Sequence, residues 1–130
     1  MGSASAGALV EISFNENVTV KAGDVLLDGR NESGDLKTVK GIYVGTLEVN
    51  TKRRGPVTKD NRFQYVFGQN VVNASYLDLN GGDINPGETR TGVRLEAEVP
   101  VTWVVGQTLT FKGGAEVYGT FTITGVWVKE

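Results

Sequence analysis

Apolar and polar residues alternate through much of the chain, most regularly between Val93 and Val99. There every second residue is apolar and the residues between are charged, which predicts a strand with one buried and one solvated face. Pro100 cannot donate a ladder hydrogen bond and marks the end of this strand. The segment Asn85-Pro86-Gly87 before it is typical of a turn, because proline presets φ and glycine accepts a positive φ.

The same pattern predicts further strands along the chain. They cover residues 10–14, 18–20, 25–27, 40–50, 62–67, 71–79, 101–105, 109–111 and 117–128. Gly45 and Gly125 interrupt two of these runs and indicate β-bulges or close backbone approaches. No window shows the apolar spacing of an amphipathic helix. Short strands separated by turns favour an antiparallel sandwich or barrel.

The fold class that follows is all-β, an antiparallel immunoglobulin-like β-sandwich, with a small Greek-key barrel of OB type as the alternative. We expect residues 8–130 to form one domain and residues 1–7 to be disordered or derived from cloning. The tryptophans and most other aromatic residues are expected to fill the interior, since alternating aromatics usually face inward.

The amino-acid composition limits the kinds of functional site that the chain can form. At 130 residues with 39% hydrophobic content, the chain is long enough to bury a core without disulfides or metal. It contains no Cys and no His, so zinc and copper sites are not expected and no histidine-activated nucleophile can form. A net charge of −2 gives no general attraction to nucleic acid or anionic membrane. No stretch is long and apolar enough to span a bilayer as a helix.

Basic residues cluster between two predicted strands. We select Arg53, Arg54, Lys59 and Arg62 as the candidate binding residues, with Lys52 beside them. They precede an alternating aromatic run at residues 63–67, and cations beside aromatics suit single-stranded nucleic acid. The interpretation we favour is a solvated loop beside core aromatics, because such an alternating run usually points inward.

Other candidate sites are weaker. Acidic residues gather in loops at residues 24–35 and 78–88, but no calcium-loop motif occurs among them. Glu96 and Glu98 share the solvated face of a strand, where cross-strand ion pairs are more usual than catalysis. Exposed tryptophan and tyrosine could stack on sugars, but we expect Trp103, Trp127 and the tyrosines to lie in the core.

Residues 35–50 carry an ordered pattern. Lys40-Gly41 and Tyr43 form the entry to a hydrophobic strand, Val49-Asn50 ends it, and Phe63 lies in the strand after the next loop. A second block, residues 84–100, carries a Pro-Gly-Glu turn followed by a Thr-Gly pair and an alternating strand that ends at a proline.

Together, and in this order, the two blocks resemble the telokin-like, immunoglobulin-like domain family of bacterial secreted proteins and lipoproteins, of the mycobacterial immunoprotective extracellular antigen type. The resemblance covers residues 35–111. It implies a sandwich of about seven to nine strands and an extracellular or cell-envelope setting. It implies no catalytic residue.

We therefore expect a non-catalytic extracellular module that recognises a protein or glycan surface, without a cofactor. Loops at residues 28–35 and 52–61 would form the contact surface, as loops on a rigid scaffold often do. The first alternative is a single-stranded DNA-binding barrel of phage or plasmid type. The second is a structural subunit of a phage or cell-surface assembly. We expect a monomer or a weak homo-oligomer that is secreted or in the cell envelope, although no leader is visible at the N-terminus.

Overall fold

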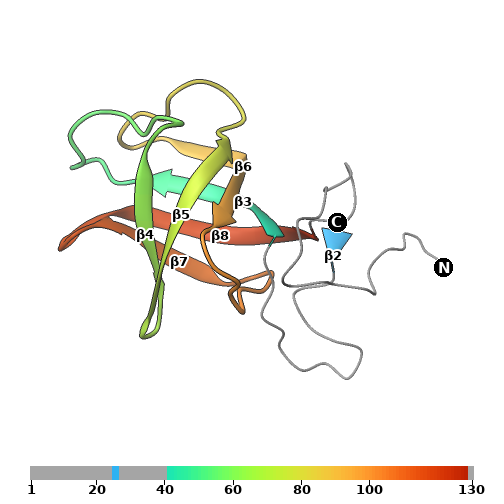
Figure 1. Ribbon diagram of the computed structural model, residues 1–130. Helices are drawn as coiled ribbons and strands as arrows, with labels where there is room; N and C mark the ends of the chain where they lie inside the picture. Colours follow the sequence, from blue (N-terminus) through green and yellow to red (C-terminus); the bar gives the residue numbers. More distant parts are fainter. Residues whose placement is uncertain (1–24, 27–40, 129–130) are drawn as a thin grey trace.

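A computed structural model of the protein describes residues 25–26 and 41–128 (Figure 1). Its strands are β2 (Val25–Leu26), β3 (Gly41–Val49), β4 (Arg62–Phe67), β5 (Asn70–Asp78), β6 (Thr89–Ala97), β7 (Thr108–Gly113) and β8 (Glu116–Val128). The described residues contain no helix, and hence no helix long and apolar enough to cross a membrane. The all-β, antiparallel prediction is confirmed. The strands predicted at residues 10–14 and 18–20 lie outside the described residues.

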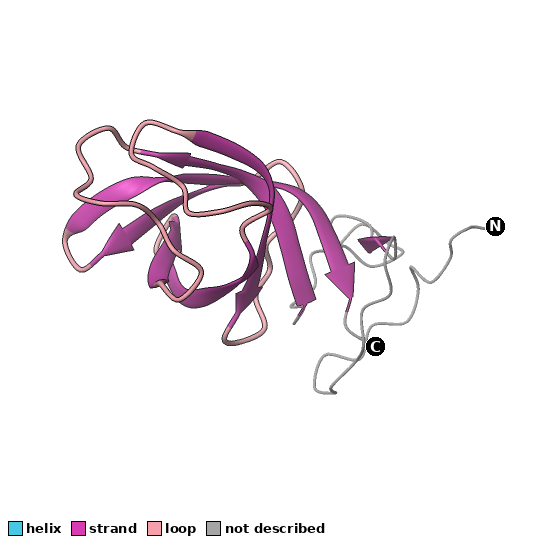
Figure 2. Ribbon diagram, turned by 90° about the horizontal axis from the view of Figure 1, so that it is seen from above, coloured by secondary structure: helices cyan, strands magenta, loops and turns pink. Residues whose placement is uncertain are grey.

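The strands form a closed barrel. Their order is β8, β3, β6, β5, β4, β7, and β7 pairs back with β8, so six antiparallel strands surround one interior (Figures 1 and 2). β2 pairs with Val126 and Trp127 of β8, beyond the part of β8 that pairs with β7. β4, β5 and β6 follow one another as hairpins while β3 returns beside β6, which is a Greek-key arrangement. The structure is therefore consistent with the small-barrel alternative, and a sandwich of two separate sheets is not confirmed.

One predicted strand is absent from the barrel. Residues 98–107, which include the predicted strand at residues 101–105, connect β6 to β7 and belong to no strand. Pro100 interrupts the ladder at the start of this segment. At its end, Gly106 N–H donates to the carbonyl of Ile123 and the Gln107 side chain accepts from Val104 N–H. These bonds fix a turn where the apolar residues had suggested a strand.

The predicted irregularities at Gly45 and Gly125 face each other. The register between β3 and β8 shifts between Val44, which lies opposite Gly125, and Gly45, which lies opposite Ile123. β8 therefore carries an extra residue, Thr124, whose hydroxyl donates to the Val44 carbonyl. The two glycines are parts of one bulge, which bends β8 around the barrel.

Buried aliphatic and aromatic side chains fill the interior. The largest fully buried ones are Tyr43, Tyr65, Phe111, Phe121, Leu47, Ile84, Leu95, Leu109, Ile123 and Val57. Aromatic rings pack against one another in edge-on and tilted arrangements, for example Tyr43 on Trp103 with ring centroids 5.1 Å apart. The prediction that the aromatics of β4 face inward is confirmed for Phe63 and Tyr65, but Phe67 is 42% exposed.

A single hydrogen bond joins two tyrosines inside the barrel. The hydroxyls of Tyr65 and Tyr76 lie 2.6 Å apart, and both residues are buried. Burial raises the pKa of both, and it raises the pKa of Tyr43 as well, because the ionised phenolate would lose its hydration. Each hydroxyl of the pair thus has a partner and stays neutral.

Gly45 provides a sharp test of the close approach between β3 and β8. A Cβ at this position would overlap the backbone carbonyl of Thr122 and come within 2.7 Å of the Phe121 ring. We expect Gly45→Ala to lower the free energy of unfolding by about 1–3 kcal/mol, as overpacking does. Gly82→Ala is the matched control, since a Cβ there meets no atom within 4 Å. Urea denaturation of both variants measures the difference, and equal midpoints would contradict this packing.

The buried tyrosines predict instability at alkaline pH. Above their usual pKa of 10.0 the unfolded chain releases tyrosine protons while the folded chain retains them. The unfolded state then binds fewer protons, so the free energy of unfolding must fall as the pH rises. Urea denaturation between about pH 8 and pH 11 should show this decline. The double variant Y65F/Y76F, which leaves neither hydroxyl orphaned, should show a smaller decline; an unchanged slope would refute the assignment.

Candidate functional site

The connections between strands gather at two ends of the barrel. At one end lie residues 50–61, residues 79–88 and the turn between β7 and β8; we call this the loop end. At the other lie the turn between β4 and β5 and the connection 98–107; we call this the pocket end. Residues 28–35, expected from the sequence to form part of a contact surface, lie outside the described residues.

Arg53, a candidate binding residue, is held against the barrel. Its guanidinium lies 4.5 Å from the centroid of the Tyr118 ring and 5.3 Å from that of Phe63, within cation–π range of both. Nη2 donates to the Pro56 carbonyl at 3.4 Å and to Asn61 Oδ1 at 3.5 Å. Arg53 therefore fixes the loop 50–61 onto β4 and β8, and its charge is turned toward the protein.

The other candidate cations divide into two groups. Arg62 forms an ion pair with Glu98 on the outer wall of the barrel. Arg54 and Lys59 are exposed, as is Lys52, and no hydrogen bond or ion pair joins these three side chains to another described residue. The structure thus leaves free cations on the loop 50–61, but it does not bring all four candidate residues together.

The aromatic residues of β4, which the nucleic-acid hypothesis paired with the cations of the loop 50–61, do not form an accessible surface beside those cations. Phe63 and Tyr65 are buried, so no base could stack on them. Phe67 is exposed, but it lies at the pocket end, whereas the loop 50–61 lies at the loop end. Cations and accessible rings therefore do not form one surface in the described part of the chain.

The acidic loop at residues 79–88 is organised by an arginine. Arg90 donates to the carbonyls of Leu79, Gly82 and Asp83 at 2.9–3.4 Å. It also makes two bonds to Glu88, at 2.6 and 3.0 Å. The guanidinium thus draws three backbone carbonyls and one carboxylate of this loop together.

Glu88 is held ionised by its own neighbours. The backbone N–H of Asn85 and the Arg90 guanidinium both donate to its carboxylate and lower its pKa. Among the described residues no group of three or more acidic side chains could hold a metal ion. The acidic loop at residues 24–35 lies outside the described residues.

No sugar-stacking platform is formed by the described aromatics. Trp103, Tyr43 and Tyr76 are each 5% exposed or less. Tyr118 is half-buried and covered by Arg53. The side chain of Trp127 is not among those described. The core interpretation is confirmed for the three buried rings.

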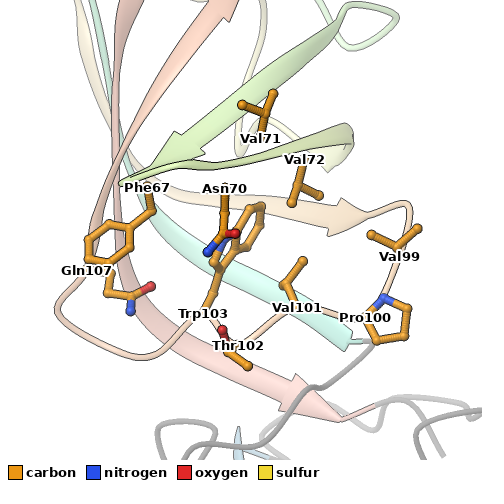
Figure 3. A pocket seen from close by; sticks show the side chains of 10 residues that line it. All are labelled: Phe67, Asn70, Val71, Val72, Val99, Pro100, Val101, Thr102, Trp103 and Gln107. Atoms are coloured by element: carbon orange, nitrogen blue, oxygen red, sulfur yellow. The ribbon is translucent and has the colours of Figure 1, made fainter.

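A pocket of about 430 Å³ opens at the pocket end (Figure 3). Its lining comes from the β4–β5 hairpin and from the connection 98–107: Phe67, Asn70, Val71, Val72, Val99, Pro100, Val101, Thr102, Trp103 and Gln107. Trp103 and Val101 lie between Phe67 on one side and Val99 on the other. None of the described residues that line this pocket is charged.

The pocket combines concavity with exposed apolar surface. Phe67 is 42% exposed, Val71 56% and Val99 53%, and all three line it. Apolar pockets with a few polar groups are the usual form of binding sites. Asn70, Thr102 and Gln107 supply such groups here.

The sequence did not predict this pocket, because the alternation of apolar and polar residues does not show which residue of a strand is the last to pack in the core. Phe67 has the inward parity of Phe63 and Tyr65 but comes directly before the turn at Gly68. Val99 has the parity of buried residues of β6 but follows the strand's last residue, Ala97. A bulky apolar residue placed immediately next to a turn was the available signal.

Comparisons with known proteins give no assignment. No protein-family model matches the chain, and no curated protein shows significant sequence similarity to it.

The role of Arg90 predicts a substitution effect. We expect Arg90→Lys to lower the free energy of unfolding by about 1–2 kcal/mol, because an ammonium cannot make the same forked set of bonds. Arg54→Lys, at an exposed residue that contacts no described partner, is the control and should be neutral. Urea denaturation gives the stability, and amide exchange in residues 79–88 should rise only in R90K. Equal behaviour of the two variants would disprove the role assigned to Arg90.

Proposed function

We propose that the protein is a non-catalytic binding module that recognises a protein partner through the pocket end of its barrel. The observation that carries this proposal is the gathering of three exposed apolar residues, Phe67, Val71 and Val99, at one pocket whose described lining carries no charge. Exposed apolar groups placed together around a concave surface are characteristic of interaction sites.

The chemistry of the pocket favours a protein over the other partners considered. A glycan would need an accessible aromatic face with hydrogen-bonding groups around it, and Trp103 in the pocket is only 3% exposed. A nucleic acid would need cations, and none occurs among the described residues that line the pocket. Aliphatic side chains and a phenyl ring with a few amide and hydroxyl groups match the side chains of another protein.

The loop 50–61 remains the basis of the second candidate, single-stranded nucleic-acid binding. Lys52, Arg54 and Lys59 are exposed on it without a described partner. Three cations without an accessible ring can attract phosphate but cannot stack a base, so this candidate has less support. A structural subunit of an assembly is a further proposal. It has less support, because subunits that pack edge to edge need free strand edges and closure of the barrel leaves few of them. The extracellular setting and the telokin-like family remain predictions.

Selection from a phage-displayed library of short random peptides tests the proposal. We expect peptides to be enriched on the full-length protein and to lose most of their affinity for the double variant Phe67→Ser, Val71→Thr. Val117→Thr is the matched control, because Val117 is 47% exposed but lies at the loop end. Isothermal titration calorimetry with one enriched peptide measures all three proteins.

Two results would refute the proposed function. One is an absence of enriched peptides. The other is enrichment of peptides that bind the double variant as well as they bind the unsubstituted protein. Circular dichroism and urea denaturation of the variants establish that any loss of binding is not a loss of folding.

A further inference from the structure

We propose that the pocket end takes an extended, uncharged apolar peptide, which adds to the barrel as a strand along β5 at Val71. This inference rests on the proposed function and specifies the form in which the partner is bound. Its basis is a short open edge that adjoins the pocket.

The open edge arises because the β4–β5 hairpin extends beyond the end of β6. β5 pairs with β4 as far as Asn70, the first residue after the turn. On its other side, β5 pairs with β6 only from Ala74 onward. The last contact there is a 3.0 Å hydrogen bond from Glu98 N–H to the Asn73 carbonyl.

The direction of the free backbone groups follows from strand geometry. In an antiparallel strand, the N–H and C=O of one residue point to the same neighbouring strand, and those of the residue two positions away point to that side as well. Asn73 directs its carbonyl toward β6, so Val71 directs its N–H and C=O to the same side, where β6 has ended. No described strand pairs with Val71 on that side. Such an edge is a template for an additional strand.

The pocket lies next to this edge. Val72 points toward Val101 and Trp103 in the pocket, with Val99 beside them, whereas the side chain of Val71 lies on the opposite face of β5 (Figure 3). A peptide paired with Val71 would point alternate side chains toward the pocket, because successive side chains of a strand point to opposite faces. Backbone pairing would then provide affinity, and the pocket would select apolar side chains.

Charge and size specify the partner further. The described lining contains no charged residue, so burying a charged peptide side chain against it would cost free energy without compensation. Ten residues of the described part of the chain line the pocket, whereas a stable protein–protein interface engages about 20–30 residues on each side. This favours a short peptide segment over a second copy of the chain.

Amide hydrogen exchange of the free, full-length protein tests whether the edge is open. We expect the Val71 amide to exchange at least about tenfold faster than the Val72 amide, which points toward β4 and is the internal control. Strong protection of Val71 would overturn the proposal, because its N–H would already have a partner. Light scattering across concentration would then show what protects the Val71 amide. A dimer would indicate a second copy of the chain, and a monomer would indicate a segment of the same chain.

Backbone methylation tests strand addition itself. A peptide enriched in the library selection is synthesised with N-methyl groups on the amides that would face β5 and, as a matched control, on the alternate amides. We expect the first peptide to bind about tenfold more weakly or worse and the control to bind nearly normally, since only the first set would donate to β5.

Equal binding of the two methylated peptides would overturn strand addition. If both still lose affinity for the Phe67→Ser, Val71→Thr variant, the proposed function survives that result. If no peptide depends on Phe67 and Val71, both proposals fail.

Discussion

Closure of the sheet through β8 is the constraint on which the rest of the structure depends. This long strand pairs with β3 along the whole of β3 and with β7 on its other side. β3 and β8 approach each other so closely that a Cβ at Gly45 or Gly119 would overlap a backbone carbonyl of the neighbouring strand. Closure removes most free edges and places the large aromatic rings in one interior.

The two ends of the closed barrel differ in how their connections are held. At the loop end, Arg53 fixes one connection by its contacts with two aromatic rings, and Arg90 fixes another by bonding its carbonyls. At the pocket end, apolar side chains next to the turns extend beyond the core and remain exposed. Arg53 and Arg90 thus hold connections at the loop end, whereas the pocket end exposes the apolar surface that we propose as a binding site.

Alternation in the sequence was sufficient to predict most described strands, because one face of each strand lies in the core. It even located the bulge, since Gly45 and Gly125 break the pattern on both strands of the pair. Alternation could not distinguish a closed barrel from a sandwich, because the inward parity of side chains is the same in both. It also misassigned residues 101–105, which form no strand although Val101, Trp103 and Val104 are buried. The candidate site was not predicted because it depends on β6 ending before the β4–β5 hairpin does. This difference in length between neighbouring strands produces no apolar–polar pattern in the sequence of either strand.

The Tyr65–Tyr76 hydrogen bond also bears on how the chain selects one alignment of its strands. Aliphatic side chains are interchangeable enough that a hairpin could slip by two residues and still bury an apolar face. A slip of that kind between β4 and β5 would separate the two hydroxyls and leave each without a partner in an apolar interior. The pair therefore selects the register of the hairpin. Its hydrogen bond is of modest strength, but a misaligned hairpin would bury two unpaired hydroxyls and would be less stable.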